Sequence, residues 1–400
     1  MTGSAAPDDR QPFWFLALLA LAVGGGAVAY VPLLTVLLPL KITGLIGAQD
    51  VPALARVTFF GAIIASIANI AFGMVSDRTR TRVPWIVTGL IISSALLVAI
   101  GRAQSVEMLI VLVMAWQIGL NMMLAPLLAW AGDCVPDSQK GLLGGLFAIA
   151  PALGGMAGSL VTFEMLVATE YRLPTNVVLV ALLVLPVVIF GRGKEREELM
   201  RPVAAKALST DQKAASRSAV SKMWIARFLV QISEAGLFAF LLFWLRSIVP
   251  DFHENTAANI FSAVLIVSVP LTLLLGRWSD RVQRPLAPLV ASAAFAGVGL
   301  SAMAGAADLP LAIVGYVLFG ISASVFLSLH SSQTLRVLPL PQHRGRDLGI
   351  FNLTNTVPSI VMPWLTLTLV PGFGFSALFV LFACFAGLAA ILLATVSRRA

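Results

Sequence analysis

The sequence is short of charged residues. Aspartate, glutamate, lysine and arginine make up 12% of its 400 residues, about half the share of an ordinary soluble domain, whereas hydrophobic types make up 58%. So few charges cannot cover a water-facing surface of this size, and so apolar a chain does not stay disordered. The composition excludes a disordered protein and argues against a soluble enzyme.

Residues and motifs that carry enzyme chemistry are scarce as well. The two cysteines, Cys134 and Cys384, are far apart and fit neither a metal-ligand spacing nor a disulfide framework. The sequence contains no Gly-x-Ser-x-Gly, no His-Glu-x-x-His and no phosphate-binding loop. We therefore expect no catalytic site, no metal, no cofactor and no ATP-driven pump within this chain.

Long apolar runs dominate instead. A bilayer core requires about 20 apolar residues per helix, and twelve runs approach or exceed that length. The first is too long for a signal peptide and is interpreted as a retained helix. The sequence thus predicts an all-α membrane protein with twelve transmembrane helices. The runs cover residues 13–40, 51–75, 83–101, 106–131, 142–166, 173–191, 221–247, 255–276, 285–306, 309–335, 347–370 and 372–396.

The basic residues predict the orientation of these helices. With the N-terminus inside, the cytoplasmic segments carry twenty-one lysines and arginines and the outer segments carry five. The positive-inside rule then places both termini in the cytoplasm. The net charge of +8 reflects topology and anionic lipid rather than nucleic acid. We expect an integral protein of the cell membrane, the inner membrane of a bacterium, that acts as a monomer.

The chain repeats itself. Gly73-Met-Val-Ser76-Asp77-Arg78 returns 203 residues later as Gly276-Arg-Trp-Ser279-Asp280-Arg281, after the second run of each half. Pro136 and Pro339, after the fourth runs, are also 203 residues apart. This duplication predicts two pseudo-symmetric six-helix bundles at 1–191 and 221–400, joined by a cytoplasmic linker at 192–220.

The duplicated Gly-x-x-x-Asp-Arg loop resembles the signature loop of the major facilitator superfamily, and the resemblance covers the whole chain. It implies secondary active transport by alternating access, with the substrate between the two bundles. The stretches Ser76–Trp85 and Arg344–Pro358 are similar to those of glycoside–pentoside–hexuronide symporters and their sucrose-transporter-like relatives. That branch implies cation-coupled uptake of sugars or other small polar solutes.

The loop also has a physical role of its own. Glycines let helices approach closely, and an aspartate can cap a helix or accept from arginine. Asp133 is expected to pair with Arg78 or Arg82, and Asp77 to contact the start of the eleventh helix. The alternative is a solvated loop that only sets topology. We predict a conformational latch formed by Gly73, Asp77, Arg78, Arg82, Asp133, Gly276, Asp280, Arg281 and Arg336.

Polar residues inside the apolar runs are candidates for the transport site, because charge within a bilayer is costly. Glu234 lies about 20 Å into the seventh helix and is the candidate proton-coupling residue, with His330 as a second proton carrier. Arg227 lies on the same face as Glu234; it pairs with Glu234, holds an anionic substrate or extends to the interface. A buried hydrogen-bonded role is the alternative for both Glu234 and His330.

Further polar and aromatic residues occur at comparable depths on helices that the family resemblance places around a central cavity. Each has core packing as its alternative role. The glycines 24–26 favour close packing over a broken binding helix. The predicted substrate-binding residues are Tyr30, Trp116, Gln117, Asn121, Gln231, Glu234, Phe238 and His330.

The sequence as a whole predicts proton-coupled uptake of a sugar-like or other small organic solute, with protons, the solute and the lipid bilayer as partners. Export of an amphipathic compound by proton antiport is the alternative, which the phenylalanine-rich helices would suit. A transporter-like assembly factor or sensor that moves nothing is a third.

Overall fold

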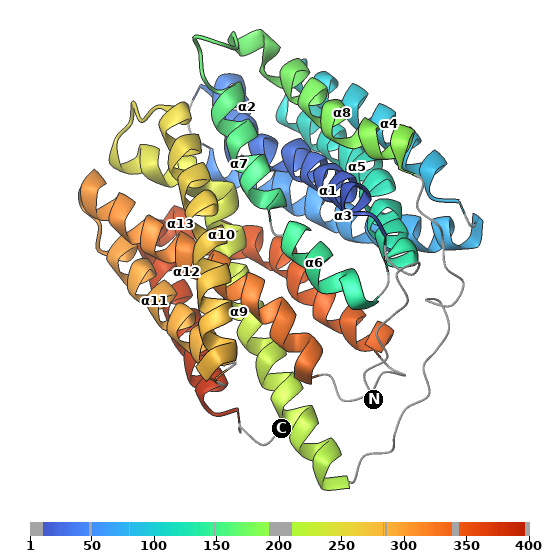
Figure 1. The fold of residues 1–400 in the computed structure, drawn as a ribbon. Coiled ribbons are helices and arrows are strands. Elements are labelled where there is room, and N and C mark those ends of the chain that lie inside the picture. The colour runs from blue at the N-terminus through green and yellow to red at the C-terminus, as the bar shows by residue number, and fades with distance from the viewer. Residues whose placement is uncertain are drawn as a thin grey trace. The chain divides into compact units, whose positions relative to one another are not determined.

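The computed structural model describes residues 11–47, 50–79, 81–135, 137–147, 149–191, 210–282, 284, 286–337 and 344–396. Every regular element in these ranges is a helix (Figure 1). The first half contains α1 (Phe13–Pro32), the π-helix η2 (Leu33–Leu37), α2 (Leu38–Ile46), α3 (Val51–Thr79), α4 (Val83–Gly101), α5 (Val106–Cys134), α6 (Asp137–Phe147), α7 (Ala150–Val161), the 3-10 helix η3 (Thr169–Tyr171) and α8 (Arg172–Phe190). The second half contains α9 (Thr210–Ile248), α10 (Glu254–Val282), α11 (Ala287–Ala304), α12 (Leu309–Val337) and α13 (Arg344–Ala394).

Most of the helices agree with the predicted apolar runs, but the run at 142–166 is divided between α6 and α7. Among the described residues, ten helices are long and apolar enough to cross a membrane. One of them, Leu353–Ala394, has 42 residues, about twice the length that a bilayer core needs. It is interrupted at Gly374, whose φ of 72° ends one helix and starts the next. The all-helical membrane fold predicted from the sequence is confirmed.

Contacts divide the chain into two compact units. The described residues of 1–33 and 60–201 form the first unit, and those of 34–59 and 202–400 form the second. The boundary at residue 33 follows Pro32 and coincides with the start of η2. This π-helix interrupts the regular hydrogen-bond pattern between α1 and α2. The repeat assigns residues 34–59 to the first bundle, but their contacts group them with the second unit. Helix α9 begins at Thr210, inside the predicted linker.

Helix α1 is the central support of the first unit, where it packs against α5, α7 and α8. A Cβ at Gly24 would approach Leu153 of α7, one at Gly25 would approach Val184 of α8, and one at Gly26 would clash with Leu124 of α5. Consecutive helical residues point about 100° apart, so three glycines in a row open three sides of α1. The glycine run serves close packing, as favoured from the sequence.

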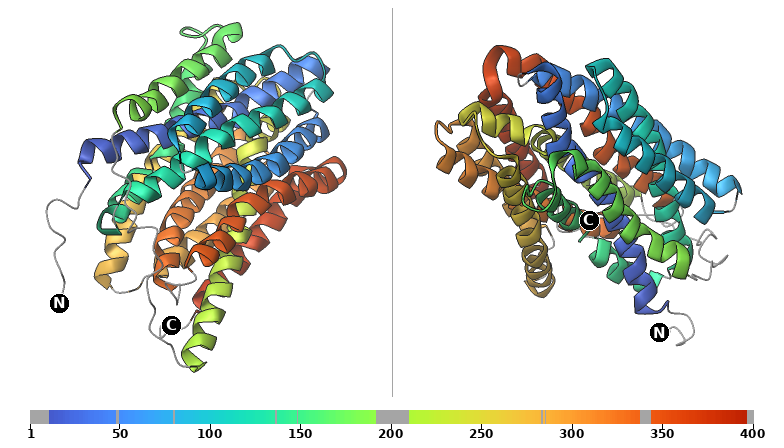
Figure 2. Two further views of the ribbon diagram at one scale, coloured as in Figure 1. Left: turned by 90° about the vertical axis from the view of Figure 1, so that its right-hand side faces the viewer. Right: turned by 90° about the horizontal axis from the view of Figure 1, so that it is seen from above.

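The corresponding helix pair of each unit is also joined through glycines. In the first unit, a Cβ at Gly89 of α4 would clash with the Met123 backbone of α5. In the second, a Cβ at Gly299 of α11 would lie 2.6 Å from the Phe319 backbone nitrogen of α12. Small residues at such crossings let membrane helices pack backbone against backbone. The close pairs α4–α5 and α11–α12 can be followed in Figures 1 and 2.

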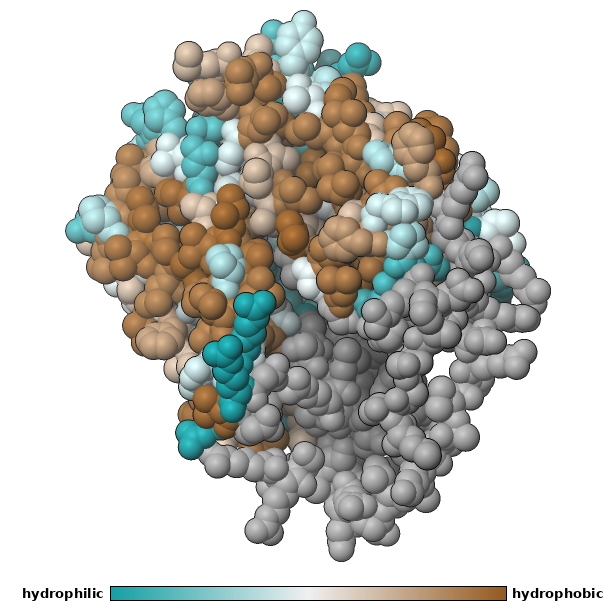
Figure 3. All heavy atoms as spheres, in the orientation of Figure 1, coloured by the Kyte–Doolittle hydropathy of each residue, from teal (hydrophilic) through white to brown (hydrophobic). Residues whose placement is uncertain are grey.

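The described surface is apolar over large areas (Figure 3). On α8, side chains at intervals of three or four residues are the exposed ones, with Leu182 at 64% and Ile189 at 62%. A water-soluble protein does not expose stripes of this kind, whereas a helix in lipid does. These faces fit contact with the bilayer.

Candidate functional site

The first polar cluster lies on α9. Arg227, Gln231 and Glu234 follow one another at intervals of three or four residues, so they share a helix face, and all three are half-buried. Gln231 Nε2 donates to Glu234 Oε2 at 2.7 Å. The structure therefore brings two of the predicted binding residues into direct contact within the apolar span Ser218–Ile248.

Arg227 connects three helices. Its Nη1 donates to the Leu327 carbonyl of α12 at 3.0 Å. Its Nε donates to Thr354 Oγ1 and its Nη2 to Asn355 Oδ1, both on α13 and both at 3.1 Å. The planar guanidinium can hold several acceptors in fixed directions at once. Arg227 therefore fixes how α9, α12 and α13 pack.

His330 of α12 lies in the core of the second unit. Its Nε2 hydrogen-bonds the Met223 carbonyl of α9 at 3.0 Å, and its ring lies 5.4 Å from that of Phe326. A carbonyl only accepts, so Nε2 carries the hydrogen. Met223 is about 16 Å along α9 from Glu234. The structure does not bring His330 and Glu234 together, and their joint proton-carrying role stays a prediction.

The second polar cluster joins α3 to α5. Asn69 Nδ2 donates to Asn121 Oδ1 at 3.2 Å, and Asn121 Nδ2 donates to the Gln117 carbonyl at 2.9 Å. The structure thus unites the predicted residues Gln117 and Asn121 and adds Asn69, which was not predicted. The signal that could have found Asn69 is an amide side chain in the middle of an otherwise apolar run.

Three other predicted binding residues have different surroundings. Trp116 is fully buried, because Gln117 faces α3 and its neighbour on the helix points about 100° away into the core. Its expected stacking on a solute stays a prediction. Phe238 packs edge-on against Phe261 of α10 at 5.8 Å between ring centroids. Tyr30 is half-buried on α1.

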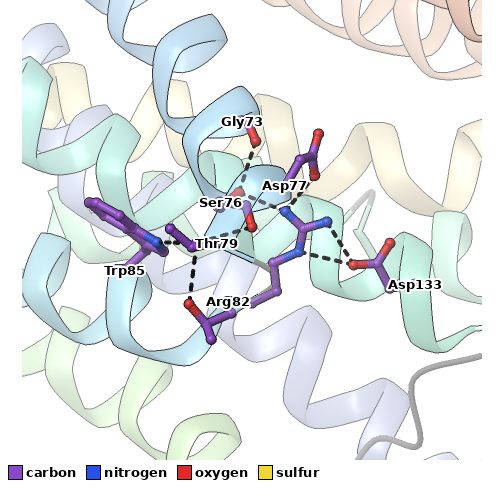
Figure 4. A network of polar contacts seen from close by, with 8 residues as sticks. Gly73, Ser76, Asp77, Thr79, Arg82, Trp85 and Asp133 are labelled. Carbon is purple, nitrogen blue, oxygen red and sulfur yellow. Dashed lines mark hydrogen bonds and ion pairs between the residues drawn. The ribbon is translucent and has the colours of Figure 1, made fainter.

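A charged network occupies the loop between α3 and α4 (Figure 4). Arg82 donates to Asp133 Oδ2 through Nε at 2.9 Å, and its Nη2 lies 2.8 Å from the same oxygen. Its Nη1 reaches Asp77 Oδ1 at 2.6 Å and Ser76 Oγ at 2.7 Å. Of the two partners expected for Asp133, the structure selects Arg82, while Arg78 is exposed. Arg82 therefore ties the end of α3 to the end of α5.

Each charge in this network lies at the unfavourable end of its helix. Arg82 precedes the first turn of α4, where the helix dipole disfavours a cation. Asp133 is in the last turn of α5 and Asp77 in the last turn of α3, where the dipole disfavours an anion. At these positions the charges do not stabilise their own helices. Their attraction for one another is therefore what stabilises them there.

The network also affects the ionisation of Arg82. Burial by itself would lower the pKa of this guanidinium, but the hydrogen bonds to Asp77 and Asp133, with their negative charges, outweigh it. The pKa of Arg82 is therefore raised above its ordinary value. Its positive charge persists at every physiological pH.

The repeated loop between α10 and α11 is built differently. Ser279 is buried like Ser76, but its hydroxyl donates to the Arg284 carbonyl at 3.1 Å. Arg281 is exposed, and the side chains of Asp280 and Arg336 lie outside the described part of the structure. The side chains at the start of the eleventh helix, the expected partner of Asp77, lie outside it too.

The two motif glycines do not mark close helix approaches. A Cβ added to Gly73 would meet no described atom within 4 Å, and one added to Gly276 would make an ordinary 3.4 Å contact with Leu329. The expectation that they allow close packing is not met among the described residues, where the tight crossings lie at other glycines, such as Gly89 and Gly299.

Comparisons with known proteins agree with this architecture. Residues 223–400 match the sequence model of the Major Facilitator Superfamily. No curated protein matches the sequence. A bacterial homologue of the human lysosomal transporter Spinster, in an inward-facing and occupied conformation, has a similar structure, with a TM-score of 0.70 and 16% identity over 96% of each chain. The chain has the major facilitator fold. With this fold and the family match in its second half, the comparisons indicate a membrane transporter rather than an enzyme.

Two further solved structures are also similar. A POT family transporter in complex with 5-aminolevulinic acid has a TM-score of 0.72 and 13% identity over 96% of each chain. The nucleoside transporter NupG has a TM-score of 0.71 and 15% identity, over 96% of this chain and 99% of that one. At these identities the likenesses show the fold alone. They do not select a branch, so the resemblance to the glycoside–pentoside–hexuronide symporters stays a prediction.

Proposed function

We propose that the protein is a proton-coupled secondary transporter that takes up a sugar-like or other small organic solute by alternating access. The observation that carries this proposal is Glu234, a half-buried carboxyl group inside a 31-residue apolar span of a chain with the major facilitator fold. Carboxyl groups at such depth mark ion or substrate pathways. Gln231 donates to it at 2.7 Å and can orient it.

The proposed transport cycle uses the membrane potential and the loop network. One positive charge that crosses 100 mV gains about 2.3 kcal/mol, which allows roughly fifty-fold accumulation per proton. Asp77, Arg82 and Asp133 act in the cytoplasmic latch, which stabilises the outward-open state. We place both termini in the cytoplasm and the monomeric protein in the inner membrane.

Glu234→Gln tests the coupling role. The variant keeps the size of the side chain and its ability to accept from Gln231, but it cannot exchange a proton at pH 7. In proteoliposomes with an imposed proton gradient, we expect it to lose gradient-driven accumulation and to retain solute counterflow. Glu164→Gln is the matched control, because the Glu164 side chain is 77% exposed in the segment between α7 and η3. Unchanged accumulation by Glu234→Gln would rule out Glu234 as the coupling acid.

Export of an amphipathic compound by proton antiport is the second candidate. The observation that favours it is the stacked pair Trp224 and Phe228, half-buried on α9 with ring centroids 5.1 Å apart. Such a pair suits an apolar ring. Transport measured in vesicles of known orientation separates the two candidates, since uptake follows the proton gradient and export opposes it.

A further inference from the structure

The amide cluster of the first unit has one member that is fully engaged. Asn121 accepts from Asn69 at 3.2 Å through Oδ1 and donates to the Gln117 carbonyl at 2.9 Å through Nδ2. Its Nδ2 also lies 3.4 Å from Gln117 Oε1. Asn121 is 8% exposed. It therefore acts as the support that fixes the amide groups of the other two residues.

The outer groups of those two residues are left for a ligand. Within the described part of the chain, neither the Asn69 oxygen nor the Gln117 amide nitrogen contacts a protein partner. Neither atom is among the fully enclosed, unsatisfied polar atoms of the described residues. Asn69 is half-buried. Gln117, like Asn121, is 8% exposed. The cluster thus presents one acceptor and one amide nitrogen with two hydrogens, neither of them fully enclosed by the described residues.

The helices that carry the cluster contain no charge near it. Between Arg56 and Asp77 on α3, and between Glu107 and Asp133 on α5, every residue is uncharged. An ionic solute group would lose its hydration here without gaining a counter-charge from these two helices. A hydroxyl or amide group, which donates and accepts at once, matches the acceptor and the donors.

We propose that Asn69 and Gln117, supported by Asn121, bind a hydroxyl or amide group of an uncharged polar solute. This inference rests on the proposed transport function and specifies its substrate class. A site built to hydrogen-bond a hydroxyl discriminates strongly against analogues that lack it, because its own polar groups are then left unpaired. The site also disfavours apolar and cationic amphiphiles, because they would leave its amide groups without hydrogen-bond partners.

The test measures binding in lipid nanodiscs by ligand-induced thermal stabilisation. The probes are a set of neutral polyols, aldoses and small amides, with tetraphenylphosphonium as the amphipathic cation. We expect neutral probes to stabilise the wild type. Asn69→Ala and Gln117→Ala should each raise the dissociation constant of the best neutral probe about tenfold. Asn259→Ala, on the exposed Asn255–Asn259 pair of α10, is the matched control and should leave it unchanged.

Asn69→Ser covers the case in which Asn69→Ala does not fold. Serine retains a donor and an acceptor on a shorter side chain, so binding should weaken without being abolished. The inference would be overturned if the cation alone stabilised the wild type. It would also be overturned if Asn69→Ala or Asn69→Ser bound the best neutral probe as tightly as the wild type does. Gradient-driven transport of a charged solute without binding of neutral probes would overturn it and leave the proposed transport intact. Binding of neutral probes without any gradient-driven transport would overturn the proposed function instead.

Discussion

Arg227 on α9 and His330 on α12 each hydrogen-bond a main-chain carbonyl of the other's helix. Arg227 Nη1 donates to Leu327, and His330 Nε2 donates to Met223, both at 3.0 Å. The donors and acceptors lie three or four residues apart on each helix, so the two bonds are about one turn apart. The pair acts as a reciprocal clasp that fixes α9 against α12.

The clasp predicts unequal effects of two substitutions. Arg227→Ala removes three bonds to α12 and α13, and we expect the free energy of unfolding to fall by about 3 kcal/mol. His330→Leu removes one described bond, with an expected loss of about 1 kcal/mol. Unfolding of the purified protein in detergent measures both. Arg102→Ala, on an exposed residue after α4, is the control. Equal losses for the two variants would contradict the three-helix role of Arg227.

Arg82→Ala should destabilise the first unit by about 3 kcal/mol, because it leaves Asp133, which is 16% exposed, without its cation at the unfavourable end of α5. Arg82→Lys restores the charge without the paired contacts, so its loss should be about half as large. Thermal unfolding checks the order wild type, Arg82→Lys, Arg82→Ala. If lysine were as harmful as alanine, the charge of Arg82 would not be what stabilises the network.

The raised pKa of Arg82 also predicts the pH dependence of this stabilisation. A group whose pKa is raised in the folded state contributes stability that is complete below the unfolded pKa and is lost as the pH rises through the folded one. For Arg82 that window begins at the ordinary pKa of an arginine, far above the physiological range. The stability difference between wild type and Arg82→Ala should therefore be constant from pH 7 to pH 9. A difference that shrinks over this interval would place the titrating group elsewhere.

Asp77→Asn should separate stability from turnover. The Asp77 side chain is 64% exposed, and exposed ion pairs contribute little to stability, so the unfolding temperature should hardly change. If Asp77 acts in the latch, the maximal transport rate should fall while the substrate affinity is retained. Initial rates over a range of solute concentrations measure both quantities. A wild-type rate would refute the latch.

Gly25→Ala should destabilise the first unit by about 2 kcal/mol. Its Cβ would lie 2.7 Å from Val184 Cγ2 and 3.3 Å from the Val180 carbonyl oxygen of α8, which is backbone and cannot turn aside. Gly44→Ala is the matched control, since a Cβ there meets no described atom within 4 Å. Alanine at Gly44 should be neutral or stabilise by up to about 1 kcal/mol. If Gly25→Ala and Gly44→Ala had comparable unfolding temperatures, α1 and α8 would be able to move apart to accommodate the added methyl group.

The sequence by itself determined the class of this protein. Apolar runs of membrane-spanning length have few other stable structures, because a backbone in lipid must satisfy its hydrogen bonds within its own helix. The duplicated loop at Asp77 and Asp280 indicated the major facilitator fold, because the same motif occurs at equivalent positions in both halves of the sequence. The contact between Gln231 and Glu234 could also be anticipated, because residues three apart on a helix are neighbours.

Only the tertiary structure decided which polar residues from different helices meet. Asn69 and Asn121 are 52 residues apart, and His330 and Met223 are 107 apart; no local pattern encodes such pairs, because they depend on how each helix is rotated about its axis. That rotation turned Trp116 into the core and left Gln117 facing α3. It also located the close crossings at Gly89 and Gly299 rather than at the motif glycine Gly73, since helix approach is set by packing along the whole span.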